Sequence, residues 1–156
     1  MLEKTHMPIG LASGFISGII NINNPLDTTF INCMVIIFAS TLPDIDIDLN
    51  KVINIKHRGF THSILFGIIL SVFIFFIYPS VLPAFLLGFY LHLAADMLTN
   101  IGVQLFYPLK KKIGFHVMGF NDPTEIAIQL CCWFIIVILA WKQVPADYKS
   151  FIFDIL

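Results

Sequence analysis

The sequence predicts an all-α, polytopic helical membrane protein with about five transmembrane helices, forming a single domain over residues 1–156. The first observation behind this prediction is composition: 58% of the residues are hydrophobic and only 12% are charged, and the mean hydropathy is +0.87. A water-soluble fold of this length could not bury so much apolar surface. The second observation is that the apolar residues gather in five stretches, which are separated by prolines, asparagines and charged residues.

Each of the five stretches contains roughly 15 to 18 residues, at or just below the length of about 20 that spans a bilayer. Proline and polar clusters mark the breaks between them. We therefore expect five membrane helices, at residues 7–22, 28–42, 62–78, 82–98 and 124–141. The last of these either spans the membrane or dips back to the side on which it began.

The basic residues predict how these helices are oriented. Lys4 precedes the first stretch, Lys51, Lys56 and Arg58 lie between the second and third, and 110–112 is a lysine run between the fourth and fifth. With five spans, all of them fall on one side, and flanks rich in lysine and arginine stay in the cytoplasm. The sequence thus predicts a multi-pass protein of the inner (cytoplasmic) membrane with a cytoplasmic N-terminus.

Side chains that bind metal ions gather at this same predicted cytoplasmic face. On the outer turns, Asp27 is the one carboxylate, whereas a random scatter of ligand types would have placed more of them there. The residues at the cytoplasmic face are His6, Asp44, Asp46, Asp48, His57, His62, His92, Asp96 and Glu125. This convergence is the strongest argument for a functional site that the residues alone supply.

His92 and Asp96 are the ionisable pair inside an apolar stretch. Their i, i+4 spacing places them on one face of a helix, where they can hold one ion. A carboxylate within a membrane helix costs about 2.5–3.5 kcal/mol on insertion scales and usually faces a polar, functional interior. The alternative is a buried pair that only locks two helices together.

The acidic segment after Pro43 offers further oxygen ligands. Asp44, Asp46 and Asp48 alternate along the chain, so an extended segment would point all three the same way. Carboxylates of this kind bind divalent cations. Solvation alone would also explain three acids in a loop, and only their neighbours favour a metal site.

Those neighbours are two histidines, His57 and His62, on either side of Arg58 and Gly59. Imidazole together with carboxylate is the ligand mixture that suits zinc or another transition metal. Arg58 has two interpretations: its guanidinium could grip a phosphate, or it could be an anchor on the cytoplasmic side.

Three further features carry open alternatives. His6 is isolated in sequence, so it is either a solvated terminal residue or a ligand. Glu125 opens the last stretch, where helix capping competes with catalysis. The lysines at 110–112 are expected to contact anionic lipid headgroups.

A formal net charge of −1 without a basic face argues against nucleic acid as a partner.

Taken together, the motifs resemble those of the YdjM-like family of predicted membrane-bound metal-dependent hydrolases. The resemblance covers roughly residues 5 to 126, and the order and spacing of its motifs make it specific. The residues that carry it are LPDID at 42–46, HRGFTHS at 57–63, GFYLH at 88–92, ADMLT at 95–99, Gly102 and Pro108. That family is itself more remotely similar to zinc-dependent phospholipase C and P1-type nucleases.

The resemblance implies a hydrolase that uses a divalent metal, zinc, as one or two ions. By this analogy the ligands are His6, Asp44, His62, His92 and Asp96, while Asp46 and His57 bind the ion or orient the residues that do. Asp46 or another loop carboxylate would act as general base, and Arg58 would offset phosphoryl charge. Glu125 matches an acidic residue in the last motif of the family. The expected partners are membrane lipids and a lipid-type phosphoester substrate.

Two other classes of protein use the same residues. A divalent-cation transporter would need polar side chains that continue across the bilayer, and the outer halves of the predicted spans supply almost none. A non-catalytic, metal-stabilised membrane protein would lose its fold, and not only an activity, when His92 is replaced.

Overall fold

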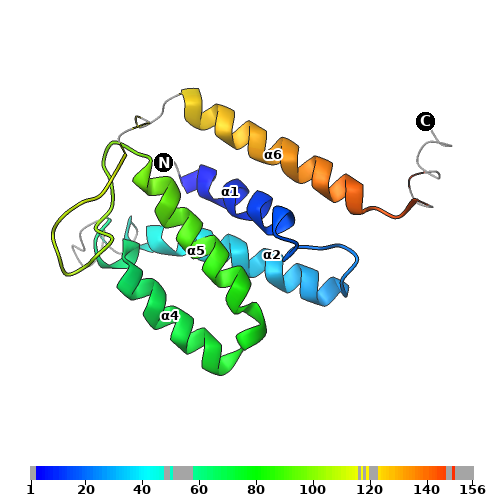
Figure 1. Cartoon of the computed structure of the whole chain (residues 1–156), viewed down its shortest axis with the longest axis horizontal. Coiled ribbons are helices and arrows are strands. Elements are labelled where there is room, and N and C mark those ends of the chain that lie inside the picture. The colour runs from blue at the N-terminus through cyan, green and yellow to red at the C-terminus, as the bar shows by residue number, and fades with distance from the viewer. Residues whose placement is uncertain are drawn as a thin grey trace.

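The computed structural model describes residues 3–47, 50, 58–115, 117, 119, 123–146 and 149. Over these ranges the protein is helical, and its one β-type pairing is an isolated bridge between Val103 and Ile113. The predicted all-α fold is confirmed, since a helix falls on each of the five apolar stretches (Figure 1). The helices are α1 (Glu3–Ile16), α2 (Leu26–Thr41), α4 (Ile64–Ile77), α5 (Leu82–Met97) and α6 (Pro123–Gln143).

Among the described residues, three helical segments are long and apolar enough to cross a membrane. They are Leu26–Ile47, Pro79–Met97 and Pro123–Gln143, with 22, 19 and 21 residues, or about 28–33 Å at 1.5 Å per residue. This matches the hydrocarbon core of about 30 Å. With 14 residues each, α1 and α4 reach only about 21 Å.

The first helix is shifted relative to the predicted stretch 7–22. It begins at Glu3 and ends at Ile16, because the chain turns at Gly18, which has φ = 76°. Glycine adopts this left-handed conformation without the steric penalty that a Cβ imposes. The turn closes with a hydrogen bond of 3.0 Å from the Ile20 amide to the Gly14 carbonyl. Residues 17–25 therefore connect α1 to α2 instead of extending the span.

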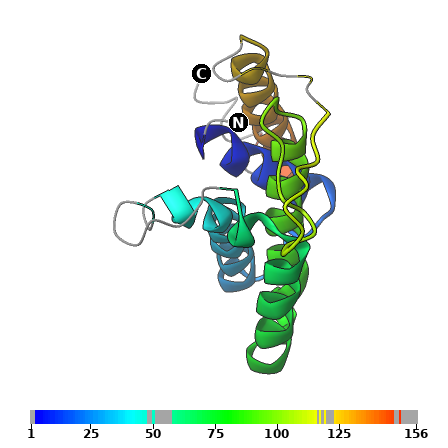
Figure 2. The ribbon, with the colours of Figure 1, turned by 90° about the vertical axis from the view of Figure 1, so that its left-hand side faces the viewer.

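The centre of the fold is the packing of α5 on α2. Phe85 and Phe89 of α5 form a buried core with Ala39 of α2. Gly88 permits the close approach, because a Cβ at this position would lie 2.7 Å from the Ile36 carbonyl oxygen. The first helix, α1, packs against both α2 and α5, and α6 packs on α1. The helix α4 packs on α5 on the side away from α1 and α6 (Figure 2).

The chain that follows α5 folds back over the end of this helix. The Phe115 amide donates to the Met97 carbonyl at 2.7 Å, and the Ile64 amide at the start of α4 donates to Leu105 at 3.0 Å. In Figure 1 this connection lies at the same end of the molecule as the start of α1, the end of α2, the start of α4 and the start of α6. The segments that carry the predicted site residues thus meet at one end.

Candidate metal centre

Four of the predicted ligands converge at this end of the fold. Asp44 comes from a short 3-10 helix that follows α2, η1 (Leu42–Asp44), and His62 comes from a second one before α4, η2 (Phe60–His62). His92 and Asp96 project from consecutive turns of α5. One ligand atom from each of the four residues lies within 4.8 Å of all the others. Sequence reasoning brought these residues together, and the fold places them in one cluster.

The spacing of these atoms suits a small coordination sphere. Nε2 of His62 lies 3.3 Å from Asp44 Oδ1, 3.2 Å from His92 Nε2 and 3.6 Å from Asp96 Oδ2. His92 Nε2 lies 3.7 Å from Asp44 Oδ1 and 3.9 Å from Asp96 Oδ2. Neighbouring ligands of a tetrahedral zinc ion, at bonds of about 2.0–2.1 Å, lie about 3.3 Å apart. These five separations, from 3.2 to 3.9 Å, are at or slightly above this spacing.

Both histidines are oriented by contacts at the opposite ring nitrogen. His92 Nδ1 donates to the Ser40 carbonyl oxygen at 2.7 Å, and His62 Nδ1 lies 3.2 Å from Asp46 Oδ2. Metal-binding histidines commonly have such a partner, which fixes the tautomer and the ring orientation. In both residues Nε2 is therefore the nitrogen that faces the cluster.

Asp44 and Asp46 are arranged differently from the sequence prediction. The chain is helical from Leu42 to Ile47, not extended, so the two carboxylates do not point the same way. They instead contact opposite nitrogens of one imidazole, Asp44 at Nε2 and Asp46 at Nδ1 of His62. The prediction failed because it assumed that Pro43 would start an extended loop, whereas proline also fits the first turn of a helix. Asp48 lies outside the described residues.

Asp46 is fully buried and accepts hydrogen bonds through one oxygen. The Arg58 amide donates to its Oδ2 at 2.9 Å and the Thr61 hydroxyl at 2.7 Å. With His62 also in contact, this carboxylate ties the segment after residue 58 to the end of α2. Its contacts support a positioning role, and the general-base role stays a prediction.

Arg58 is buried beside the cluster, and its two interpretations, phosphate binding and a cytoplasmic anchor, stay predictions. Its side chain is buried, with Nη2 3.0 Å from Asp96 Oδ1 and Nη1 donating to Thr99 Oγ1 at 2.8 Å. Its backbone has φ = 61°, an uncommon conformation for a residue with a side chain. Arg58 thereby holds one oxygen of Asp96 while the other oxygen faces His62 and His92.

His6 lies next to the four-ligand cluster. It is 2% exposed, and its ring stacks on that of His92 with 3.9 Å between centroids. Nε2 lies 3.4 Å from Asp96 Oδ1, but neither ring nitrogen makes a hydrogen bond to another described residue. Burial of a polar group without such a bond is costly, and the ligand role of His6 stays a prediction.

The two remaining predicted residues have different outcomes. Glu125 is buried in the first turn of α6, and the Thr5 hydroxyl donates to its Oε1 at 3.4 Å. It therefore joins α6 to α1 at the residue beside His6, and its catalytic role stays a prediction. His57, the other predicted ligand, lies outside the described residues.

His62 is the titratable group whose environment bears on metal binding. Burial is the largest single influence and lowers its pKa, but the hydrogen bonds to the Asp44 and Asp46 carboxylates together with the Coulombic attraction of Asp46 and Asp96 raise the pKa by more, so it lies above its ordinary value. A raised pKa means that the imidazole holds its second proton to a higher pH. A metal ion binds the neutral imidazole and must displace that proton.

Three residues of the site were not predicted: Ser40, Thr61 and Thr99. Thr61 and Thr99 stand within the motifs that carry the family resemblance, so that pattern was a signal for them. Ser40 contributes a backbone carbonyl, which every residue has, and no sequence signal could have singled it out.

Fold and site together define a multi-pass helical membrane protein with a buried carboxylate–imidazole cluster at one end of its helices. The chain belongs to the YdjM inner membrane protein family, whose model matches residues 1–148. This confirms the family resemblance and places the protein in the inner membrane. The similarity to zinc-dependent phospholipase C and P1-type nucleases stays a prediction.

Two curated relatives match part of the chain. "Inner membrane protein YdjM" of Escherichia coli (strain K12) is 39% identical over 82 residues, which cover 48% of this chain and 42% of the relative. The protein of the same name from Shigella flexneri matches with the same identity and coverage. The match thus spans less than half the length of these relatives. No solved structure matches the chain.

Proposed function

We propose that this protein is a membrane-bound, metal-dependent hydrolase that cleaves a phosphoester of the lipid type at the cytoplasmic membrane face. The observation that carries the proposal is the cluster of Asp44, His62, His92 and Asp96, whose ligand atoms lie within 4.8 Å of one another. These four residues would hold the metal, with His6 beside them as a further ligand. We propose zinc, as one or two ions, because mixed imidazole and carboxylate donors suit it.

The charge of the cluster also favours a divalent cation. Asp44, Asp46 and Asp96 are buried, and Arg58 is the cation in direct contact with Asp96 among the described residues. With neutral histidines, three carboxylates and one guanidinium leave two negative charges. Buried charges of one sign are strongly destabilising unless they are compensated, and one divalent cation would compensate them.

The contribution of the chain itself is to hold the ligands in place before a substrate binds. Ser40 orients His92, Asp46 orients His62 and Arg58 orients Asp96. The chemistry that a bound divalent metal supplies is Lewis acidity toward water and toward a phosphoryl oxygen. Of the four ligands Asp44 is the most exposed, at 9%, so the cluster is largely shielded from bulk water. Such shielding strengthens electrostatic interactions with a developing charge.

The core of the bundle favours an enzyme over a cation transporter. A polar cavity of about 250 Å³, lined in part by Asp27, Asn32 and Ser80, lies at the far ends of α2 and α5. Between this cavity and the cluster, α2 and α5 bury Ile36, Phe85 and Phe89. A transit path would need polar groups there.

Metal analysis of the detergent-purified protein tests the proposal. We expect stoichiometric metal in wild type, little in His92→Ala and Asp96→Asn, and a normal amount in the control Asp27→Asn, which removes a carboxylate at the opposite end of α2. Circular dichroism establishes that each variant is folded. The metal-loaded wild type should then hydrolyse bis-p-nitrophenyl phosphate, whereas the two ligand variants should not.

Two results would reject this function. Wild type that binds no metal after reconstitution with zinc, manganese or iron would leave His92 and Asp96 as a structural pair. Bound metal without hydrolysis, together with unfolding of both ligand variants, would indicate a metal-stabilised scaffold.

A further inference from the structure

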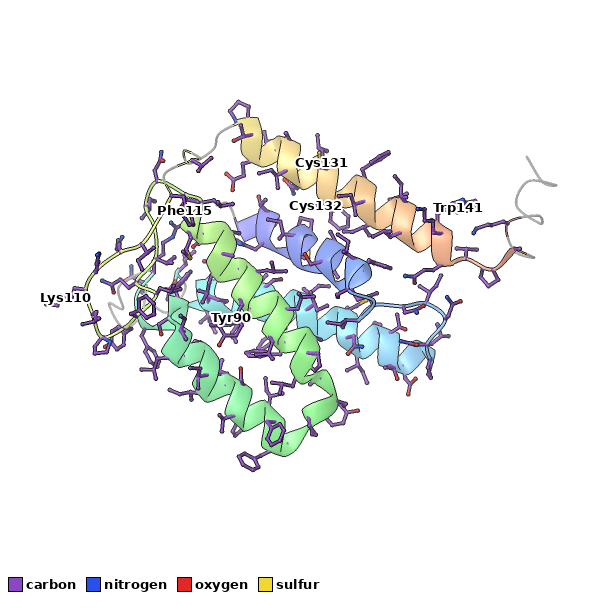
Figure 3. All side chains as sticks on the ribbon, in the orientation of Figure 1. Tyr90, Lys110, Phe115, Cys131, Cys132 and Trp141 are labelled. Atoms are coloured by element: carbon purple, nitrogen blue, oxygen red, sulfur yellow. The ribbon has the colours of Figure 1, made fainter. Side chains whose placement is uncertain are left out.

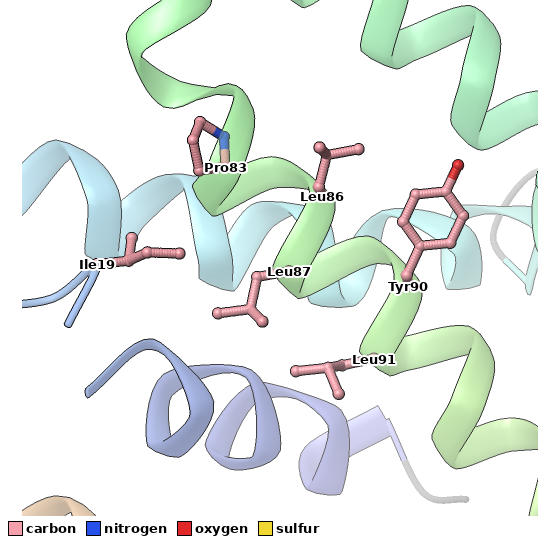
Figure 4. Close-up of a pocket in the computed structure, with 6 residues that line it drawn as sticks. All are labelled: Ile19, Pro83, Leu86, Leu87, Tyr90 and Leu91. Carbon is pink, nitrogen blue, oxygen red and sulfur yellow. The ribbon is translucent and has the colours of Figure 1, made fainter. Parts of the chain in front are cut away.

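Two apolar cavities lie along one face of α5 and share Leu91 as a lining residue. The second, of about 370 Å³, is lined by Ala94, Ala95 and Leu98 of α5 and by Ile9 of α1. The first, of about 450 Å³, is shown in Figure 4 and is lined by Ile19, Pro83, Leu86, Leu87, Tyr90 and Leu91. We call the two cavities together the α5 groove.

The shape of the α5 groove fits a long and narrow ligand. Pro83, Leu87, Leu91, Ala94 and Leu98 recur at intervals of three and four residues, so they form one stripe along the helix. From residue 83 to residue 98 the helix rises about 22 Å. This exceeds half of the bilayer hydrocarbon core of about 30 Å. Because α5 belongs to a segment that is long and apolar enough to span a membrane, lipid chains can reach this stripe.

One end of the α5 groove lies at the end of α5 that carries the metal centre. Ala95 lines the groove and directly precedes Asp96, and Ile9 lies one helical turn after His6 on α1. A chain seated in the groove would therefore have its polar head at the same end of the bundle as the ligand cluster. The opposite end, near Pro83, lies toward the predicted outer side of the membrane.

Positive charge lies at the same end as the metal centre. Phe115 also lines the groove, and its amide is hydrogen-bonded to the Met97 carbonyl at the end of α5. The same connection carries the lysines of 110–112, which are exposed. Figure 3 shows Phe115 beside the end of α5 and Lys110 farther out on this connection. A headgroup at this end would meet cations, which complements an anionic phospholipid.

We propose that the α5 groove binds one acyl chain of an anionic phospholipid, with the headgroup phosphate at the metal-centre end. The inference rests on the proposed function, because it names the substrate class of that site. It adds that chain length contributes to recognition, through apolar surface buried in the groove.

Lipid titration of the delipidated full-length protein in detergent, followed by native mass spectrometry, tests the groove. We expect wild type to retain one dioleoyl phosphatidylglycerol. Leu91→Trp fills the point that both cavities share and should weaken retention roughly tenfold, equivalent to about 1.4 kcal/mol. Ala94→Phe is a second variant at an exposed position, where added bulk enters the groove without crowding the core. The control Val137→Trp adds bulk to α6, where the residue is 64% exposed, and should bind like wild type.

Two further lipids separate the chain from the headgroup. Dihexanoyl phosphatidylglycerol keeps the headgroup but lacks long chains, so all variants should bind it equally weakly. Dioleoyl phosphatidylcholine keeps the chains without the net negative charge and should bind wild type more weakly than the anionic lipid. Folded Leu91→Trp and Ala94→Phe that both retain dioleoyl phosphatidylglycerol like wild type would overturn the proposal. Equal retention of the two dioleoyl lipids would overturn the anionic preference.

The metal content of the same samples distinguishes a failure of the groove from a failure of the proposed function. Metal-free His92→Ala should still retain the lipid, because the groove does not include the ligand cluster. Lipid retention without any hydrolysis would reject the hydrolase and keep the groove. Hydrolysis with no effect of Leu91→Trp or Ala94→Phe on lipid retention would reject the groove and keep the hydrolase.

Discussion

The two imidazoles of the cluster are held by different chemical groups, and this difference determines how each can be perturbed. His92 donates to the backbone carbonyl of Ser40, which no side-chain substitution removes. His62 is oriented by the carboxylate of Asp46, which also accepts from Thr61 and from the Arg58 amide. The partner that orients His62 can therefore be removed by a side-chain substitution, whereas the partner that orients His92 can be displaced only by moving the backbone of α2.

Asp46→Asn should weaken metal binding without abolishing it. The amide keeps the size of the side chain but loses the charge that favours the correct His62 tautomer. Loss of such a partner typically costs 10–100-fold in metal affinity, and we expect a decrease of about this size. Competition with a fluorescent chelator measures the affinity, with Asp27→Asn as the control. Unchanged affinity in folded Asp46→Asn would show that Asp46 does not position the ligand.

The protonation of His62 predicts opposite pH trends with and without metal. Burial lowers the pKa of His62, and hydrogen bonds to Asp44 and Asp46 together with the Coulombic attraction of nearby carboxylates raise it by more, to above its ordinary value of about 6.5. A raised folded-state pKa stabilises the metal-free protein below about pH 6.5, and this contribution disappears as pH rises through the folded-state value. Metal affinity rises over the same interval, because the metal binds the neutral ring.

Thermal unfolding across this interval checks these trends. With chelator present, Tm should fall as pH rises above about 6.5. The amount by which zinc raises Tm above its value in chelator should become larger as pH rises. His62→Asn should flatten both dependences. A Tm in chelator that rises with pH in wild type and falls in His62→Asn would contradict the assignment.

At the scale of helices, the sequence predicted what depends on local spacing. His92 and Asp96 share a helix, so their common face follows from the i, i+4 rule and is found in the structure. Local rules left open whether the chain after Pro43 is extended or helical, because proline fits both conformations. In the helical form Asp44 and Asp46 contact His62, 16 to 18 residues away. The end of α1 at Ile16 depends on the left-handed conformation of Gly18.

The contact of α5 with α2 positions the site, and Gly88 is its most sensitive residue. A Cβ at Gly88 would lie 2.7 Å from the Ile36 carbonyl oxygen and 3.2 Å from the Ser40 amide nitrogen. Backbone atoms cannot move aside as side chains do, so Gly88→Ala should separate the helices and cost about 1–3 kcal/mol. It should also weaken metal binding, because Ser40 orients His92.

Gly14→Ala is the matched control for this prediction. Its added methyl group would meet the ends of the Ile20 and Ile36 side chains, which can change rotamer. We expect a smaller loss of stability and unchanged metal affinity. Denaturant unfolding and chelator competition measure the two quantities. Equal losses in the two glycine variants would show that the approach of α5 to the α2 backbone is not limiting.

At the scale of the whole molecule, the site exists because the ends of separate helices meet. The described part of the chain brings the start of α1, the end of α2, the start of α4 and the end of α5 to one end of the bundle (Figure 1). The sequence predicted this meeting from alternating spans, and it required no knowledge of how the helices pack. Packing decides the rest: Arg58 pairs with Asp96, and His6 stacks on His92.

The orientation of the bundle in the membrane decides which compartment the site faces. The exposed lysines of 110–112 lie at the same end as the metal centre, and such basic connections stay in the cytoplasm.

Replacing the free cysteines Cys33, Cys131 and Cys132 with serine gives a background for single-cysteine labelling. In intact cells whose outer membrane is permeable to the reagent, a membrane-impermeant maleimide should label Asn24→Cys at the opposite end of the bundle. Lys111→Cys should react only after the inner membrane is opened. Labelling of Lys111→Cys in intact cells, with Asn24→Cys protected, would place the metal centre on the outer side and require a substrate from that compartment.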